Sequence, residues 1–265
     1  MQLNIVPPAT GAKWAKEGIQ TFFKQPLALG GLFFMFMAAA SVASIIPVLG
    51  SVLALVILPG ATLGLMVATL EASRGKFPMP SVLATAFRAG KERLRAMLGL
   101  GVMYAVGFLF VMSVTTLFDG GDFATLYLVG GRLTPELLNN PDFQTATLVG
   151  MGLYLPLSLL FWHAPALVHW HGVSPLKAIF FSMVACWRNK GAFLVFGMAW
   201  MAIFSLAGII VMTLAAVIGM PAAGGALMMG VALITAAMFF SSIYFTFRDS
   251  FVHDAKDDET STAQK

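Results

Sequence analysis

Apolar residues dominate four long stretches of the chain, none of which contains Asp, Glu, Lys or Arg. The stretches follow Lys24, Arg95, Asp142 and Lys190 and are 46, 23, 34 and 57 residues long. One crossing of a bilayer by an α-helix takes about 20 apolar residues. The first and last stretches therefore have room for two helices each, and the other two for one helix each. The pattern predicts an all-α fold, a polytopic transmembrane bundle of six helices.

The two longest stretches each need a turn, and both contain Pro and Gly at a suitable place. Residues 46–50 include Pro47 and Gly50, and residues 219–225 include Pro221 between glycines. Pro and Gly are the residues that most often end helices and form turns. We therefore place the spans in a single transmembrane domain, residues 1–247, at 27–46, 49–70, 96–118, 147–168, 192–218 and 223–247.

Two polar segments lie outside these spans. Residues 119–146 form the sizeable external loop, and Thr134 followed by Pro135 predicts a short helix with Thr134 as its N-cap and Pro135 as its first residue. Residues 248–265 are polar, and we expect a disordered cytoplasmic tail.

Basic residues are distributed very unevenly between the two sides of the predicted spans. Fifteen of the sixteen Lys and Arg residues fall on one side, and the exception, Arg132, lies in the external loop among four acidic residues. Because cytoplasmic segments of membrane proteins carry the excess of Lys and Arg, both termini are predicted to be cytoplasmic.

The composition excludes a soluble globular protein. Hydrophobic residues make up 58% of the 265 residues and charged residues 11%, whereas soluble domains carry about 25% charged residues. The first apolar run begins near Pro26, after a polar stretch, and is longer than the apolar part of a cleaved signal peptide. We therefore expect this first helix to be retained.

A basic amphipathic segment precedes spans one, three and five. Such segments lie in the headgroup plane with the apolar face in the bilayer and the cations towards anionic lipid. We expect an interfacial helix in each, the third with Ser174 as N-cap and Pro175 as its first residue. The predicted lipid-facing cations are Lys13, Lys16, Lys24, Arg88, Lys91, Arg93, Arg95, Arg188 and Lys190.

An internal repeat is one explanation for these recurring segments. At an offset of 97 residues, Pro59 aligns with Pro156 and Gly75 with Gly172, and three further positions also match. Repeats of this kind are common in membrane folds. The alternative is that membrane topology alone demands a basic loop before each pair of helices.

Residues 11–26, 161–168 and 182–190 resemble a family of uncharacterised six-helix inner-membrane proteins of Gram-negative bacteria. The similarity extends over most of the chain and is weakest in the external loop. The resemblance implies a multi-pass protein of the bacterial inner membrane with six helices, and it implies no activity.

His163 is the one ionisable residue predicted to lie inside a span. Such a residue is a functional candidate by default. Pro165, however, frees the carbonyl of Phe161 from its helical hydrogen bond. A histidine that packs beside a helix kink is the competing interpretation, so His163 and Pro165 are candidate functional or packing residues.

The sequence offers no cofactor or metal site. Cys186 is the only cysteine, which excludes an intramolecular disulfide and a cysteine-based metal centre. His169 and His171 are separated by two positions, whereas helical metal pairs are separated by four. We interpret the aromatic residues around them as an interfacial belt, and we predict no nucleic-acid partner.

The predicted spans contain no Asp, Glu, Lys or Arg, although ion-coupled transporters usually keep carboxylates there. We therefore favour a non-enzymatic protein that organises lipid, expected to be anionic, or a protein partner, including a second copy of itself, through its basic cytoplasmic face. The first alternative is a facilitative carrier or channel for a small neutral or amphipathic molecule. The second is an intramembrane enzyme that uses His163.

Overall fold

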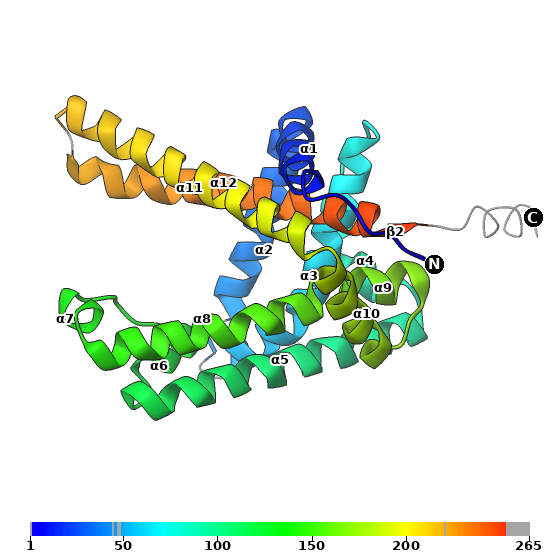
Figure 1. Ribbon diagram of the computed structural model, residues 1–265, viewed down its shortest axis with the longest axis horizontal. Helices are drawn as coiled ribbons and strands as arrows, with labels where there is room; N and C mark the ends of the chain where they lie inside the picture. The colour runs from blue at the N-terminus through cyan, green and yellow to red at the C-terminus, as the bar shows by residue number, and fades with distance from the viewer. Residues whose placement is uncertain (1, 44, 47–48, 220, 253–265) are drawn as a thin grey trace, which may run out of the picture. The chain divides into compact units, whose positions relative to one another are not determined.

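The computed structural model describes residues 2–43, 45–46, 49–219 and 221–252, and they are almost entirely helical (Figure 1). Six helices are long and apolar enough to cross a membrane, which confirms the predicted all-α fold and the number of spans. These spans are Pro26–Ala43, Leu49–Ser73, Lys91–Asp119, Pro141–His171, Lys190–Val217 and Gly224–Ser250. The predicted turn residue Pro47 and most of the predicted tail lie outside the described residues.

Two compact units make up the chain. One comprises Met1–Phe33, Leu65–Val82 and Ala185–Lys265, and the other comprises Phe34–Gly64 and Leu83–Val184. Helices α2 (Pro26–Ala43) and α3 (Leu49–Ser73) each contribute to both units. The single transmembrane domain stays a prediction.

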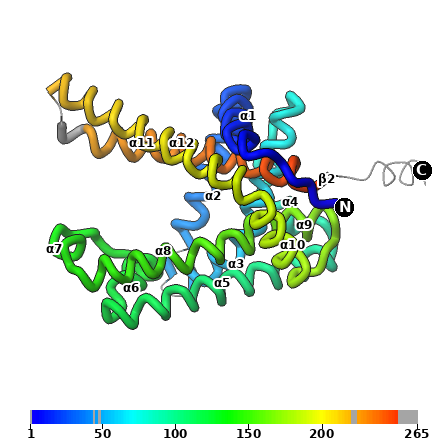
Figure 2. The backbone as a smooth tube through the Cα atoms, in the orientation of Figure 1, coloured from blue at the N-terminus to red at the C-terminus, as the bar shows by residue number. Residues whose placement is uncertain are grey.

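In the first unit, helix α1 (Thr10–Lys24) packs against α11 (Lys190–Val217) and α12 (Pro221–Ser250), which run side by side (Figure 2). Small residues allow this approach. A Cβ atom added to Gly11 would lie 2.6 Å from the backbone nitrogen of Phe196, and one added to Gly18 would lie 2.6 Å from the Cα of Ser242. Trp14, fully buried, packs its ring against Phe196.

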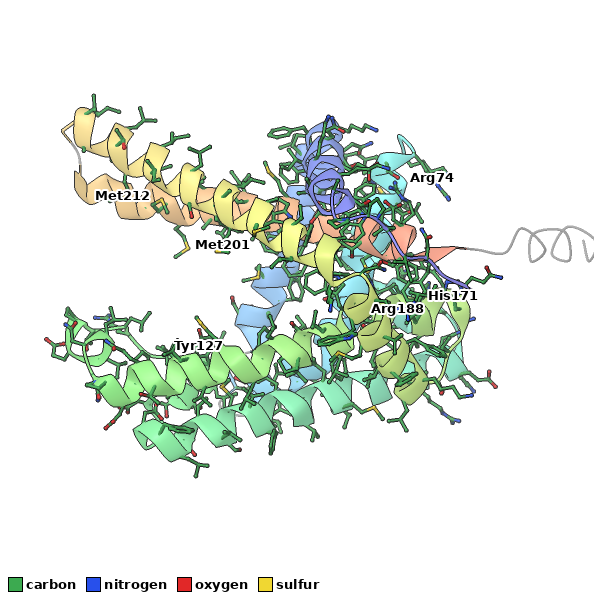
Figure 3. All side chains as sticks on the ribbon, in the orientation of Figure 1. Arg74, Tyr127, His171, Arg188, Met201 and Met212 are labelled. Carbon is green, nitrogen blue, oxygen red and sulfur yellow. The ribbon has the colours of Figure 1, made fainter. Side chains whose placement is uncertain are left out.

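The packing of α1 corrects part of one expectation. We expected the apolar face of this segment to enter the bilayer; Ala15 and Phe22 of this face, with Trp14, are buried within the protein, whereas Phe23 is 63% exposed. The face that remains exposed carries Lys13 and Lys16. The spanning helix α11, in contrast, exposes apolar side chains on its surface. Met201 and Met212, labelled in Figure 3, are examples.

Both ends of the described chain meet in the first unit. Strand β1 (Gln2–Leu3) pairs antiparallel with β2 (Phe251–Val252), which directly follows α12. The side-chain amide of Asn189, just before α11, donates to the carbonyl of Asn4 at 3.0 Å and accepts from the N–H of Val6 at 3.0 Å. The two ends therefore lie on the same side of the spans, as an even number of crossings requires.

In the second unit, α5 (Lys91–Asp119) packs along α8 (Pro141–Phe161). Their shared core includes Tyr104, Val111 and Leu157. Gly107 of α5 faces Leu157, and an added Cβ would lie 2.6 Å from that side chain. Short helices α6 (Asp122–Leu128) and α7 (Pro135–Leu138) connect α5 to α8, and Phe123 of α6 belongs to the same core.

The segment before α5 differs from the predicted interfacial helix. It consists of a 3₁₀ turn, η1 (Pro80–Ala84), and a single α-helical turn, α4 (Thr85–Arg88). Gly90 then adopts φ +95° and ends the run, a conformation that residues with a Cβ atom rarely adopt. Lys91 and Arg95 consequently belong to the spanning helix α5 itself.

The segment before α11 is the predicted helix, α10 (Pro175–Arg188). The carbonyl of Ser174 accepts the first helical bond, from the N–H of Ala178 at 2.9 Å. The two glycines aligned by the proposed repeat both have positive φ, +77° at Gly75 and +65° at Gly172, and both follow a helix. This agreement is local, and the repeat stays a prediction.

Candidate functional site

The fourth span is interrupted at His163. Helix α8 ends at Phe161 and α9 (Ala164–His171) begins after His163, with Pro165 in its first turn. In a continuous helix the N–H of His163 would bond to the carbonyl of Leu159. Here the hydroxyl of Ser182, on α10, accepts from the N–H of His163 at 2.9 Å and donates to the carbonyl of Leu159 at 2.8 Å.

Ser182 thus bridges the broken helical turn. The freed backbone groups keep partners, which is required where no water can supply them. His163 and Ser182 are both fully buried. The Ser182 hydroxyl donates to one main-chain group and accepts from another, so this serine joins α10 to the main chain on both sides of the interruption. The sequence predicted a kink near Pro165, and the structure has an interruption of the helix there. The hydroxyl that bridges the interruption belongs to Ser182, 19 positions after His163.

The predicted lipid-facing cations are mostly exposed. Exposed positions are Lys13, Lys16, Lys24, Arg88, Lys91, Arg95, Arg188 and Lys190. Lys190 also lies over the ring of Trp187, 5.3 Å from its centroid. Arg93 differs, because it is partly buried and donates to the carbonyl of Val168 at 3.0 Å. Arg93 therefore satisfies an acceptor in the last turn of α9 and has one nitrogen fewer to offer to lipid.

A polar cluster fixes the contact of α1 with α12. The indole N–H of Trp14 donates to one carboxylate oxygen of Asp249 at 3.1 Å, and Arg248 donates to the other at 2.7 Å. Arg248 also pairs with Glu17 at 2.8 Å. One guanidinium thus pairs with two carboxylates, so the cluster carries no uncompensated positive charge, and the positive charge of α1 lies on its exposed lysines.

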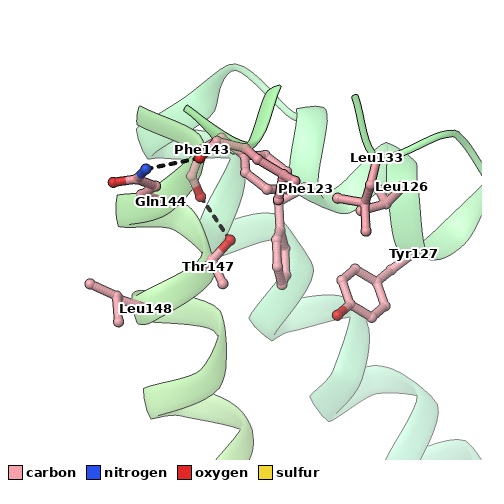
Figure 4. A pocket seen from close by; sticks show the side chains of 9 residues that line it. Phe123, Leu126, Tyr127, Leu133, Phe143, Gln144, Thr147 and Leu148 are labelled. Atoms are coloured by element: carbon pink, nitrogen blue, oxygen red, sulfur yellow. Dashed lines mark hydrogen bonds between the residues drawn. The ribbon is translucent and has the colours of Figure 1, made fainter. Parts of the chain in front are cut away.

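The connection between α5 and α8 holds an apolar cavity of about 450 Å³ (Figure 4). Two of the three polar side chains in its wall donate hydrogen bonds to nearby backbone carbonyls, and the third is Tyr127. The side-chain amide of Gln144 donates to the carbonyl of Leu138 and the hydroxyl of Thr147 donates to the carbonyl of Phe143, both at 2.8 Å. The cavity is lined by Phe123, Leu126, Tyr127, Leu133, Leu138, Phe143, Gln144, Thr147 and Leu148.

Local turn chemistry builds this connection. The carboxylate of Asp119 accepts from the N–H groups of Gly121 and Phe123 at 2.9 and 2.7 Å and so starts α6. Thr134 accepts from the N–H of Leu137 at 3.3 Å, as expected of the predicted N-cap. The backbone N–H of Glu136 and the Thr134 hydroxyl stabilise the Glu136 carboxylate and lower its pKa.

Neither the cavity nor helix α6 was predicted from the sequence. The loop that contains them carries four acidic residues, which are typical of an irregular polar connection. Two signals were present: the Asp119-Gly120-Gly121 turn, and the aromatic residues Phe123 and Tyr127 spaced by one helical turn. They predict an amphipathic helix, although not the partner that it covers.

A known protein is similar to this chain over most of its length. The chain is 37% identical over 254 residues to a protein of Burkholderia thailandensis named as a "probable inner membrane protein", and the match covers 95% of this chain and 94% of that protein. The chain belongs to that protein's family. No family model matches it, and no solved structure gives a significant match.

Membership of this inner-membrane family, together with the six apolar helices, makes the chain a multi-pass protein of the inner membrane. The resemblance found in the sequence is thereby confirmed. Residues in the segments that carried this resemblance have packing roles. Gly11 and Gly18 allow close contact of α1 with α11 and α12, and Ser182 bridges the interrupted helix at His163. The relative's name states a location and no activity.

Proposed function

We propose that this protein acts without enzymatic chemistry, by organising anionic phospholipid at the cytoplasmic face of the inner membrane. The exposed lysines of α1 and the exposed cations at 88–95 and 188–190 hold the phosphate groups. A protein partner with an acidic surface is the other candidate for the same cations.

One observation supports this proposal above the rest: α1 packs against α11 and α12 through its buried residues Trp14, Ala15 and Phe22. Protein contacts therefore hold this helix, although Phe23 stays 63% exposed and is available to the bilayer. Lys13, Lys16 and Lys24 are presented on a helix whose position is fixed by protein contacts. A cationic surface that is rigidly held loses little conformational entropy when it binds an anion.

The size of the effect follows from the number of cations. A Lys or Arg near an anionic membrane surface contributes about 1 kcal/mol, so the three lysines of α1 together contribute about 3 kcal/mol. Since 1.4 kcal/mol corresponds to a tenfold change, the preference for anionic over neutral lipid is about a hundredfold at low salt. Screening reduces it at physiological ionic strength.

The test removes charge from α1 without touching its buried face. Replacing Lys13 and Lys16 by Gln should lower the anionic lipid that co-purifies with the protein, measured by lipid mass spectrometry at matched salt. Replacing the same residues by Arg is the matched control and should keep the lipid. A parallel pair, Arg88→Gln with Lys91→Gln, tests the second segment, and Arg95 remains there as a topology signal.

Two results separate the alternatives. Unchanged anionic lipid in both Gln variants contradicts the proposal for these cations, which would then serve topology alone. Retained lipid together with loss of a co-purifying protein supports the protein partner instead.

The cytoplasmic location of both termini is part of this proposal. It rests on the charge bias and agrees with the pairing of β1 with β2, which places both ends on one side. A cysteine at Asn140, a partly buried position of the predicted external loop, should react with an impermeant thiol reagent from the periplasm. Labelling from the cytoplasm alone would contradict this orientation and show that both termini are periplasmic.

A further inference from the structure

The apolar cavity beside α8 lies at the end of α5 that is opposite to its basic residues, since Lys91 starts this helix and Asp119 ends it. It is therefore independent of the lipid surface proposed above. No charged residue lines it, and of its three polar side chains the Thr147 hydroxyl and the Gln144 amide group donate to backbone carbonyls, while Tyr127 adds an aromatic ring with one hydroxyl. An interior of this chemistry favours hydrocarbon over any ionic or strongly hydrogen-bonding ligand.

The bilayer is the neighbouring source of hydrocarbon. Thr147 and Leu148 belong to the membrane-spanning part Pro141–His171, and Leu148 is 72% exposed at the edge of the cavity. The opposite wall consists of α6 and the segment that follows it, which connect the spans. A hydrocarbon chain of a lipid that enters past Leu148 therefore stays in mostly apolar surroundings.

Tyr127 extends this apolar path. Its side chain is 59% exposed and lines both this cavity and a second one of about 180 Å³, whose walls include Leu55 and Phe108. The two cavities share this one lining residue, and rotation of an exposed side chain is fast.

One basic residue lies next to the cavity in sequence, in a loop that also carries four acidic residues, and it is the group that can hold a phosphate. Arg132 is exposed and directly precedes the lining residue Leu133, and it is the only Lys or Arg between Arg95 and Lys177. An arginine is well suited to a phosphate group. We propose that the cavity binds one acyl chain of a bilayer phospholipid, with the phosphate group on the side of Arg132.

Photochemical labelling tests the site in the full chain. The protein is reconstituted in vesicles that contain a phospholipid with a diazirine in one acyl chain, and the labelled peptides are identified by mass spectrometry. We expect label on residues 123–148. Thr147→Trp fills part of the cavity. If the larger side chain excludes two methylene groups of the lipid from the cavity, binding weakens about tenfold, and labelling should fall about tenfold.

Thr145→Trp is the matched control. Thr145 lies two residues away on α8, is exposed, does not line the cavity, and donates to its own helix at 2.9 Å as Thr147 does at 2.8 Å. It should label like the unmodified protein. Leu133→Asp, in a segment without helix, places a carboxylate in the wall without a substitution in any span and should also reduce labelling.

Three outcomes would overturn the proposal. Equal labelling in all four proteins, or label confined to spanning residues outside the cavity, shows that bulk lipid alone reacts. Labelling by a diazirine fatty acid but not by the phospholipid shows that the chain comes from another source.

Discussion

Replacement of Ser182 by Ala isolates the bridge that holds the broken fourth span. The substitution removes one hydroxyl, which donates to the carbonyl of Leu159 and accepts from the N–H of His163, at 2.8 and 2.9 Å. Both backbone groups belong to a membrane-spanning segment, and Ser182 is fully buried. Water cannot replace the lost partner there.

The expected loss of stability follows from these two bonds. Side-chain hydrogen bonds inside membrane proteins contribute about 0.6 kcal/mol on average and about 1.7 kcal/mol at most. Two bonds therefore give about 1–3 kcal/mol. The lower end applies if the helix closes and the N–H of His163 reaches the carbonyl of Leu159 directly.

The free energy of unfolding can be measured by titration with a denaturing detergent in mixed micelles, followed by circular dichroism. Ser158→Ala is the matched control, since Ser158 is only partly buried on α8 and its hydroxyl donates at 2.7 Å to its own helix. It should change the stability by less than about 0.5 kcal/mol, as surface substitutions usually do. If Ser182→Ala is as stable as this control, the bridge does not stabilise the fold and the argument fails.

Three further predictions concern other parts of the chain. Gly18→Val should prevent close packing of α1 on α12 and destabilise the protein, whereas Gly31→Ala, where nothing lies within 4 Å of an added Cβ, should be neutral or slightly stabilising in the same titration. If His163 has only a packing role, His163→Asn should retain the phenotype that a deletion removes while His163→Leu does not, and loss with both changes would point to proton chemistry. Thr134→Ala should raise the pKa of Glu136 towards its ordinary value, measured by carbon NMR of the carboxyl group, and an unchanged pKa would show that Thr134 does not lower it. Because this pKa is lowered in the folded chain, the stabilisation of α7 is present above the ordinary pKa and is lost as the pH falls.

The sequence by itself determined the number and approximate position of the spanning helices. Hydrocarbon accepts few charged groups, so every crossing appears as a charge-free stretch in the chain, whatever the helix later contacts. Local chemistry likewise determined α7, since Thr134 and Pro135 act within one turn. Charge-free stretches and helix caps depend only on residues close together in the sequence, so the sequence alone predicts the helices that they define.

Only the tertiary structure decided which partner each apolar or polar group finds. Hydropathy gives α1 an apolar face but does not distinguish a bilayer from α11 and α12, because both are equally apolar. Pro165 marks a break, yet the hydroxyl that bridges it belongs to Ser182 on another helix. The cavity at Tyr127 exists because residues from α6, α7 and α8 are brought together, and their proximity depends on packing over distances that no local pattern encodes.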